Sequence, residues 1–235
     1  MTSLHSYYPL GVEIQQYVPN ESSTLALVSI FALACILVFA VAFSFATKIN
    51  PSISNCDLSI VFWFALCGSI HSILEGYYAF NFTDLAGKQT LLAQLWKEYS
   101  MSDSRYLTSN SFVMSMETIT AVFWGPLSFL LVSFIITDNP FRHPLQIIIS
   151  LGQLYGDVLY YATCAFEYFV YGLEFSRPEG YYFFGYFVFL NAFWIVIPLM
   201  LLFSSVKACG RAFTDVKSVK VAMTNGVNGT VKKTL

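Results

Sequence analysis

The stretch that decides the fold is LSIVFWFALCGSIHSILEGYYAF, residues 58–80. A helix that crosses a lipid bilayer needs about 20 predominantly apolar residues, and this stretch is long enough to provide them. His71 and Glu75 are the two residues within it that are charged or readily become charged near neutral pH. A charged side chain at the centre of such a helix costs about 2.5–3.5 kcal/mol, so each one requires a reason. The stretch therefore predicts a membrane-spanning helix that carries a functional polar pair.

The composition of the whole chain supports a membrane protein. Of its 235 residues, 56% are hydrophobic and only 11% are charged, against roughly 25% charged in soluble domains. The charges fall in clusters separated by long uncharged stretches, which is typical of a multi-pass protein. A net charge of -2 provides no basic stripe for phosphates, so nucleic-acid binding is excluded. The five cysteines occur singly without C-x-x-C spacing, so we predict neither a disulfide framework nor a metal site.

Windows bounded by charged residues predict five spans, near residues 23–47, 58–80, 112–136, 145–171 and 181–206. The first is too long for a signal-peptide core and follows no basic residue, so we interpret it as a retained helix. We predict an all-α membrane protein whose five transmembrane helices form a bundle with an intramembrane polar pocket. Residues 1–22 precede the bundle and residues 207–235 form a basic tail. A short interfacial helix is expected over Leu91–Tyr99.

The distribution of Lys and Arg predicts the orientation. The first 23 residues contain none, whereas the tail contains six, so the tail is expected to be cytosolic and the N-terminus lumenal. With five spans the cytosolic side then carries 8 basic residues and the other side 4. The ending Lys232-Lys233-Thr234-Leu235 resembles the dilysine signal that returns membrane proteins to the endoplasmic reticulum. Lysines at these positions are also common by chance in polybasic tails. We predict a multi-pass protein of the endoplasmic reticulum membrane.

Three of the predicted spans carry polar side chains at helical spacing. The pairs are His71 with Glu75, Glu117 with Thr120, and Asn191 with Trp194. Residues three or four apart share one helix face, so the three faces are expected to converge on one pocket. Pro126 and Pro198 are expected to bend their helices and widen the bundle.

Each polar residue also has a purely structural interpretation. His71 and Glu75 would serve as a hydrogen-bonded link between helices, worth about 0.6–2 kcal/mol. Asn191 alone is more often such a link, and Trp194 alone is more often a packing residue or an interface anchor. Asp157 is interpreted as structural, with its charge neutralised by a neighbouring helix. The joint presence of the three pairs favours a functional pocket, because ionisable residues inside a membrane are usually functional.

Such a pocket has the groups that proton transfer to carbon requires. A carboxyl group in a low-dielectric site is disfavoured in its charged form, so one of Glu75 and Glu117 is expected to keep its proton. His71 would relay that proton, and the indole face of Trp194 would stabilise a cation developing on a substrate carbon. This combination suits protonation and deprotonation of an alkene.

Five stretches together resemble the emopamil-binding protein family. They are HSILEGYY at 71–78, LWKEY at 95–99 with DSRY at 103–106, METITA at 116–121 followed by WGPL at 124–127, GQLYGDVLY at 152–160, and NAFW at 191–194. The matches run in order from about residue 60 to 205. The resemblance implies a five-helix EXPERA-type fold and sterol Δ8-Δ7 isomerase activity in the endoplasmic reticulum, without a cofactor.

The resemblance also implies a mechanism and residue roles. A proton is added at carbon 9 of a 3β-hydroxysterol, a cation forms at carbon 8, and a proton leaves carbon 7. By match, His71, Glu75 and Glu117 handle the protons, Thr120 and Asn191 orient them, and Trp194 faces the cation. Which carboxyl group donates stays open. The expected partners are the sterol, the lipid bilayer, cationic amphiphilic inhibitors that imitate the cation, and a second copy in a homodimer.

Two other functions remain open at this point. A non-catalytic receptor for sterols or amphiphilic amines is compatible with the same fold, because fold does not determine function. The complete six-residue set favours the enzyme, since a receptor has no need of it. A proton-coupled transporter is a distant third, because we find only five spans, no internal repeat and no pair of interrupted helices.

Overall fold

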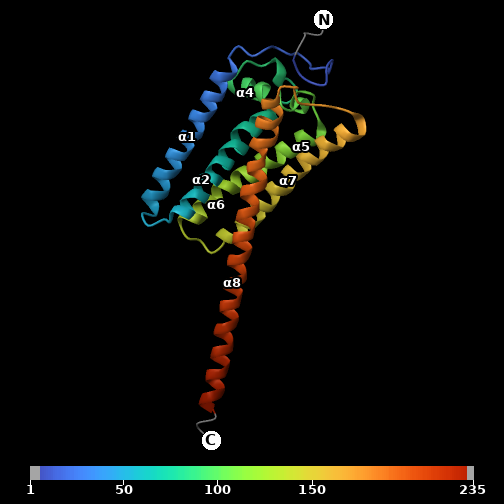
Figure 1. Cartoon of the computed structure of the whole chain (residues 1–235). Helices are drawn as coiled ribbons and strands as arrows, with labels where there is room; N and C mark the ends of the chain where they lie inside the picture. The colour runs from blue at the N-terminus through green and yellow to red at the C-terminus, as the bar shows by residue number, and fades with distance from the viewer. Residues whose placement is uncertain (1–5, 232–235) are drawn as a thin grey trace.

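The structure is a computed structural model that describes the backbone of residues 6–231 and the side chains of residues 6–223. Every regular element in that range is a helix. The elements are α1 (Thr24–Ile49), α2 (Asn55–Ser69), η1 (Ile70–Glu75), α3 (Gly76–Asn81), η2 (Leu85–Gly87), α4 (Leu91–Tyr99), η3 (Ser104–Leu107), α5 (Ser111–Ile119), η4 (Thr120–Trp124), α6 (Gly125–Ile136), α7 (Arg142–Tyr171), η5 (Tyr181–Leu190) and α8 (Asn191–Val231). Figure 1 shows them as a helical bundle from which the end of α8 projects.

Four helical stretches in the described range are long and apolar enough to cross a membrane. They are Thr24–Ile49, Asn55–Asn81, Ser111–Ile136 and Tyr181–Met223. The second joins α2, η1 and α3, and the third joins α5, η4 and α6. By length and composition these four confirm an all-helical membrane protein. They lie where four of the five spans were predicted.

The fifth predicted span, near 145–171, is present as the helix α7 but is not among the four apolar stretches. It has 30 residues, so its length is sufficient. Its composition is not apolar enough, because one face of α7 buries polar side chains, including Gln146, Ser150, Gln153 and Asp157. Five spans are therefore not confirmed by length and apolar composition, although α7 packs along α8 and α6 within the bundle.

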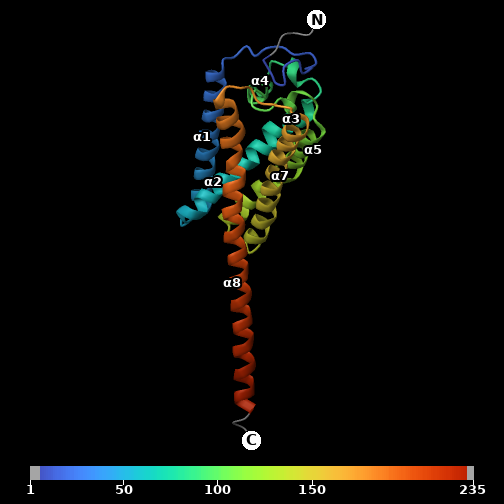
Figure 2. The same cartoon turned by 45° about the vertical axis from the view of Figure 1, so that its right-hand side comes forward.

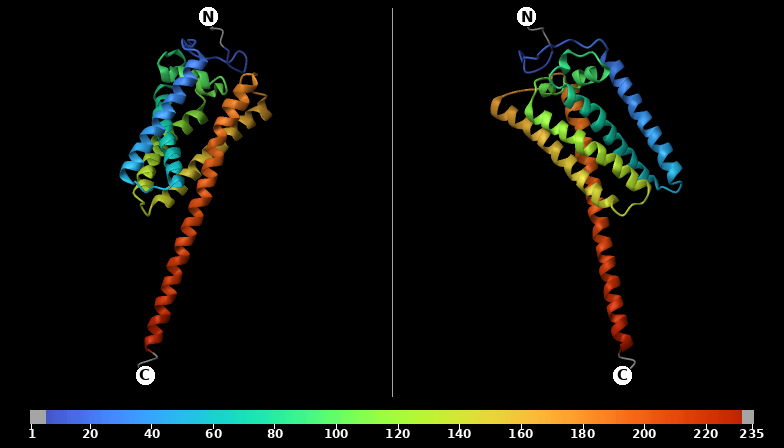
Figure 3. Two further views of the ribbon diagram at one scale, coloured as in Figure 1. Left: turned by 60° about the vertical axis from the view of Figure 1, so that its left-hand side comes forward. Right: turned by 180° about the vertical axis from the view of Figure 1, so that it is seen from behind.

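The helices pack into one bundle with a peripheral first helix. Figure 2 shows α7 and α8 side by side, and α2 packs against α6 and α1. An apolar cluster that includes Ala46, Phe64, Leu131 and Ile149 fills the space between α1, α2, α6 and α7. The outward side of α1 exposes large apolar residues such as Leu33, as expected of a lipid-facing surface. Both views in Figure 3 place α1 at the edge of the bundle.

A polar cap covers the end of the bundle where the described chain begins. It contains α4, which spans Leu91–Tyr99 and so confirms the predicted short helix. The segment before α1 is tied to this helix: the Tyr7 hydroxyl donates to the carbonyl of Lys97 at 2.9 Å, and Lys97 Nζ donates to the carbonyl of Val18 at 2.8 Å. These bonds therefore hold the segment that precedes α1 against α4.

A buried ion pair fixes the loop that follows α4. Arg105 donates to the Asp103 carboxylate through Nε at 3.0 Å and through a terminal nitrogen at 2.7 Å, and both side chains are almost fully buried. Burial alone would lower the pKa of Arg105, but the Asp103 carboxylate outweighs this effect and keeps that pKa raised. The pair anchors this loop against α7, since Arg105 also donates to the hydroxyl of Thr163.

Three π-helical segments interrupt the long helices: η1, η4 and η5. Such segments are rare and occur often at functional sites. Pro126 lies at the start of α6, directly after η4, so a local distortion exists near the position where a bend was predicted. Pro198 lies inside α8, which continues past it as one helix, and the bend expected there stays a prediction.

The last helix also differs from the predicted boundary near residue 206. The helix α8 continues without interruption to Val231, so the described part of the basic tail is helical and projects beyond the bundle (Figure 1). Lys232 and Lys233, on which the retrieval signal depends, lie outside the described residues.

Candidate active site

A cavity of about 840 Å³ lies inside the bundle. All six predicted site residues line it: His71, Glu75, Glu117, Thr120, Asn191 and Trp194. Its wall is largely apolar, with residues from α1 such as Phe31 and Phe39. The structure therefore places the six predicted residues around one cavity, whose surface is less polar than the expected pocket.

His71 is held between two helices by both of its ring nitrogens. Its Nδ1 lies 2.7 and 2.8 Å from the two carboxyl oxygens of Glu75, one turn further along. Its Nε2 lies 3.2 Å from the amide nitrogen of Gln153 on α7. An amide nitrogen can only donate, so Nε2 accepts and the ring proton sits on Nδ1, facing the carboxylate. His71 and Glu75 are 2% and 8% exposed, so this pair is almost free of solvent.

Glu117 is the second buried carboxyl group, 4% exposed. The hydroxyl of Tyr106 donates to its Oε1 at 2.6 Å. Glu117 also interacts electrostatically with Glu75 and His71, which places the two acids in one site. The site therefore brings two carboxyl groups and an imidazole together in a place almost free of solvent.

The remaining three predicted residues lie on the cavity wall but form no hydrogen bond with the carboxyl groups of Glu75 and Glu117. The Thr120 hydroxyl donates to the backbone carbonyl of Glu117 at 2.8 Å, within its own helix. The Asn191 amide donates to the hydroxyl of Tyr99 at 2.9 Å and to the carbonyl of Phe187 at 2.8 Å. The predicted orienting role of Thr120 and Asn191 is thus not visible as a direct contact with a carboxyl group.

Trp194 lies beside the imidazole, with ring centroids 6.4 Å apart in an edge-to-face arrangement. Its ring also packs against Trp63 at 5.4 Å, and its indole nitrogen has no hydrogen-bond partner within the described part of the chain. An aromatic ring next to the proton-carrying groups is the arrangement that stabilises a cation in the cavity.

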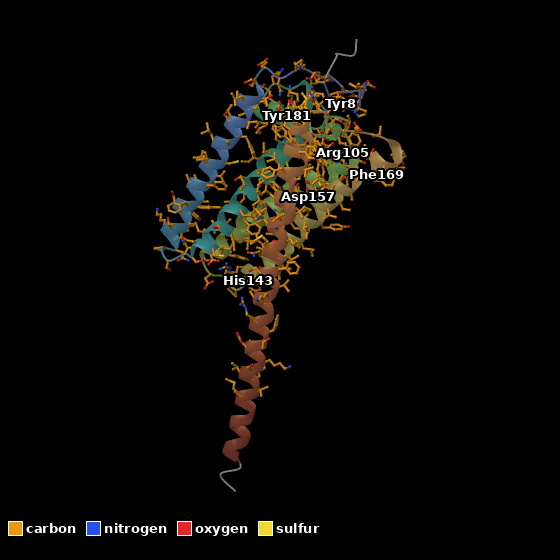
Figure 4. The ribbon with its side chains drawn as sticks, viewed as in Figure 1. Tyr8, Arg105, His143, Asp157, Phe169 and Tyr181 are labelled. Carbon is orange, nitrogen blue, oxygen red and sulfur yellow. The ribbon has the colours of Figure 1, made fainter. Side chains whose placement is uncertain are left out.

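The surroundings of Asp157 differ from those that the sequence predicted. We expected a neighbouring helix to neutralise it, but among the residues described no hydrogen bond or ion pair to its carboxyl group is found, and its Oδ2 is buried without a partner. It is 8% exposed and lines the cavity (Figure 4 shows it at mid-height of the bundle). A third carboxyl group therefore faces the same space.

Sequence reasoning did not identify Gln153, Tyr99 or Tyr106 as site residues. Gln153 had a usable signal, because it lies four residues before Asp157 on one face of a helix. Tyr106 had none, since it lies in the short helix η3 and only the folding of the cap brings it to Glu117. The π-helical segments also had no sequence signal, yet η1 contains His71 and Glu75, η4 begins at Thr120, and Asn191 follows η5.

The fold and the cavity define a class: a helical protein with membrane-spanning stretches and a largely apolar cavity on whose wall two glutamates and a histidine lie together. The chain belongs to the EXPERA (EXPanded EBP superfamily) family, whose profile matches residues 91–205. It is 40% identical over 222 residues to the 3-beta-hydroxysteroid-Delta(8),Delta(7)-isomerase of Mus musculus, covering 93% of this chain and 95% of that protein. The proteins of the same name from Rattus norvegicus (40% over 225 residues, 94% and 96% covered) and Cavia porcellus (39% over 206 residues, 87% and 88% covered) are similarly close.

Proposed function

We propose that this protein is a sterol Δ8-Δ7 isomerase, which moves a ring double bond of a 3β-hydroxysterol within the membrane. The observation that carries the proposal is the cluster of His71, Glu75 and Glu117 on the wall of a largely apolar cavity. The relatives named above bear the name of this activity and align with nearly the whole chain. No relative named above is a receptor, so the non-catalytic alternative has no observation in its favour.

The reaction needs one proton in and one proton out. A carboxyl group of the Glu75 and Glu117 pair delivers a proton to carbon 9, and the electron pair of the double bond forms the new C–H bond. The positive charge then rests on carbon 8, next to the Trp194 ring and the remaining carboxylate. Loss of a proton from carbon 7 forms the new double bond. The proton returns to the His71, Glu75 and Glu117 cluster, so the enzyme is regenerated without a net change.

The apolar wall supports this chemistry in two ways. It binds the hydrocarbon body of a sterol, which arrives from the bilayer without passing through water. It also excludes water, which would otherwise capture a carbocation. The polar groups needed for proton transfer are then the principal reactive groups in contact with the substrate.

The proposal includes five membrane crossings with α7 as the fourth. The described chain begins at one end of the bundle and ends beyond the other (Figure 1), which supports an odd number of crossings. The positive-inside rule then places the basic tail, residues 207–235, in the cytosol and residues 1–22 in the lumen of the endoplasmic reticulum. A homodimer also stays a prediction, to be checked by the mass of the purified protein in light scattering.

The test of the proposed function is conversion of a Δ8 sterol by the purified protein in lipid nanodiscs. We expect a Δ7 product by gas chromatography and mass spectrometry, and we expect Glu174→Gln, which changes an exposed acid outside the cavity, to retain it. Folded wild-type protein that forms no Δ7 product would refute the isomerase.

The same site predicts inhibition by lipophilic amines. An ammonium group imitates the cation at carbon 8 and would sit between the acids and Trp194. We expect a tertiary amine with an apolar tail to inhibit conversion competitively, and its neutral carbon isostere to bind much more weakly. Equal inhibition by the amine and by its carbon isostere would argue against a cation-stabilising cavity.

A further inference from the structure

The polar groups along the cavity wall are not evenly distributed. Glu98, Tyr99, Tyr181 and Tyr186 line its end beneath the cap, where Figure 4 shows Tyr181. From that end the cavity follows α1 from Leu27 to Phe39, about 18 Å at 1.5 Å per residue. The far end is lined by Phe39, Trp63 and Ile197. The cavity thus has one polar end and a long apolar remainder, as a sterol has one hydroxyl group and a long apolar body.

Glu98 is the charged group at the polar end, and it belongs to none of the proton-transfer contacts. It is 7% exposed and lies near the end of α4. The Thr24 hydroxyl at the start of α1 donates to its Oε2 at 3.1 Å, and the Tyr186 hydroxyl on η5 donates to its Oε1 at 3.4 Å. The carboxylate is therefore held between the two helices that flank this part of the cavity.

The hydrogen-bonding capacity of Glu98 is not filled. A carboxylate offers about four acceptor positions, and the structure occupies two of them, one with a long contact. Within the described chain no cation forms an ion pair with Glu98, and Arg177, which interacts with it electrostatically, is paired with Glu179. Burial raises the pKa of Glu98, and the two hydroxyl donors oppose that change. A further hydroxyl donor from a ligand would complete the site.

Glu98 also lies next to a residue that contacts the predicted site. Its neighbour Tyr99 accepts a hydrogen bond from the Asn191 amide at 2.9 Å. Glu98 and Tyr99 both line the cavity that His71, Glu75 and Glu117 line. In a sterol, one six-membered ring separates the oxygen on carbon 3 from the ring that holds the double bond. A sterol hydroxyl group at Glu98 would therefore leave the ring system in the same cavity as the proton-transfer groups.

We infer that Glu98, with Tyr186 and Thr24, forms the subsite that accepts the hydrogen of the sterol 3β-hydroxyl group and sets the position of the double bond against the proton-transfer groups. The inference rests on the proposed isomerase function and deepens it. It also fits the bilayer, where the sterol hydroxyl lies at the interface, because desolvating an unpaired hydroxyl is costly. A sterol entering beside α1 with its hydroxyl at the cap keeps that orientation.

The experiment compares a Δ8 3β-hydroxysterol with its 3-deoxy counterpart in nanodiscs. For wild-type protein and for Glu174→Gln, we expect kcat/KM for the alcohol to exceed that for the 3-deoxy compound at least about tenfold, the scale of a hydrogen bond to a charged group. In Glu98→Ala the ratio should fall to about one, while kcat/KM for the 3-deoxy compound stays at the wild-type value. A merely structural role of Glu98 would instead lower both rates together.

The outcomes separate the two proposals. Wild-type protein that converts both compounds equally well would overturn the hydroxyl subsite and leave the isomerase intact. An equal loss for both compounds in Glu98→Ala would overturn the subsite as well. Wild-type protein that converts neither compound would refute the isomerase itself. If Glu98→Ala does not fold, Glu98→Gln replaces it in the experiment, because glutamine keeps the size of the side chain and one acceptor oxygen. For this variant, the ratio of kcat/KM for the alcohol to kcat/KM for the 3-deoxy compound should fall several-fold.

Discussion

At the scale of single residues, the two nitrogens of His71 have different partners and therefore different roles. The pair with Glu75 was predictable, because a spacing of four places both on one helix face. The bond from Gln153 was not, because it joins residues 82 positions apart. In the proposed proton-transfer site, an amide nitrogen donating to Nε2 would keep the ring proton on Nδ1, so we expect Gln153 to act as a positioning residue.

This role predicts a specific defect in Gln153→Leu. Without the amide donor the ring proton is free to move to Nε2, which breaks the link to Glu75. We expect kcat to fall about 10–100-fold with little change in KM, and the pH profile of kcat to shift. Gln146→Leu is the matched control, because it removes a buried amide from the same helix away from the cavity. A kcat for Gln153→Leu equal to that of Gln146→Leu would contradict the positioning role.

At the scale of elements, apolar length and charge spacing predicted the positions of four long apolar helical stretches, since these patterns follow directly from the bilayer. The boundaries of α1 and of the second and third spans agree with prediction within a few residues. The π-helical segments were not predictable, because an extra residue per turn is stabilised by packing between elements. Here η1 packs against η4, and both carry site residues.

Close packing of α7 against the third span gives a prediction about glycine. A Cβ atom at Gly152 would collide with the rigid ring of Trp124, whereas one at Gly156, a turn later, would meet open space. We expect Gly152→Ala to destabilise the protein by about 1–3 kcal/mol. Gly156→Ala should leave stability unchanged or raise it slightly, because alanine favours helix. Thermal unfolding in detergent measures both, and equal melting temperatures would show that the helices can separate at Trp124.

At the scale of the whole molecule, the sequence predicted one bundle with a cavity and a basic tail. It did not predict the shape of the cavity or of the tail. The described part of the tail continues helix α8 to Val231, and no proline follows Pro198 to interrupt it. The cavity is more apolar than expected, since apolar side chains from α1, η5 and α8, such as Phe31, Phe189 and Ile197, line it beside the polar groups. The position of α1 depends on the cap and could not be read from the sequence.

The orientation gives a prediction for the intact protein in sealed microsomes. The tail contains Lys207, Arg211, Lys217 and Lys220 on an exposed helix, so added trypsin should remove a C-terminal tag. An N-terminal tag should stay protected until detergent opens the vesicles. Protection of the C-terminal tag in sealed vesicles would reverse the predicted orientation.

The central claim is that protons move between the buried acids and a sterol carbon, and isotope incorporation tests it most directly. Wild-type protein and Glu117→Gln are incubated with a Δ8 sterol in deuterated water, and the product is analysed by mass spectrometry, with Glu174→Gln as the control. The account predicts a Δ7 product with one deuterium from wild type and control, and at least a 100-fold loss in Glu117→Gln. A Δ7 product without deuterium, or turnover by Glu117→Gln at the wild-type rate, would contradict it.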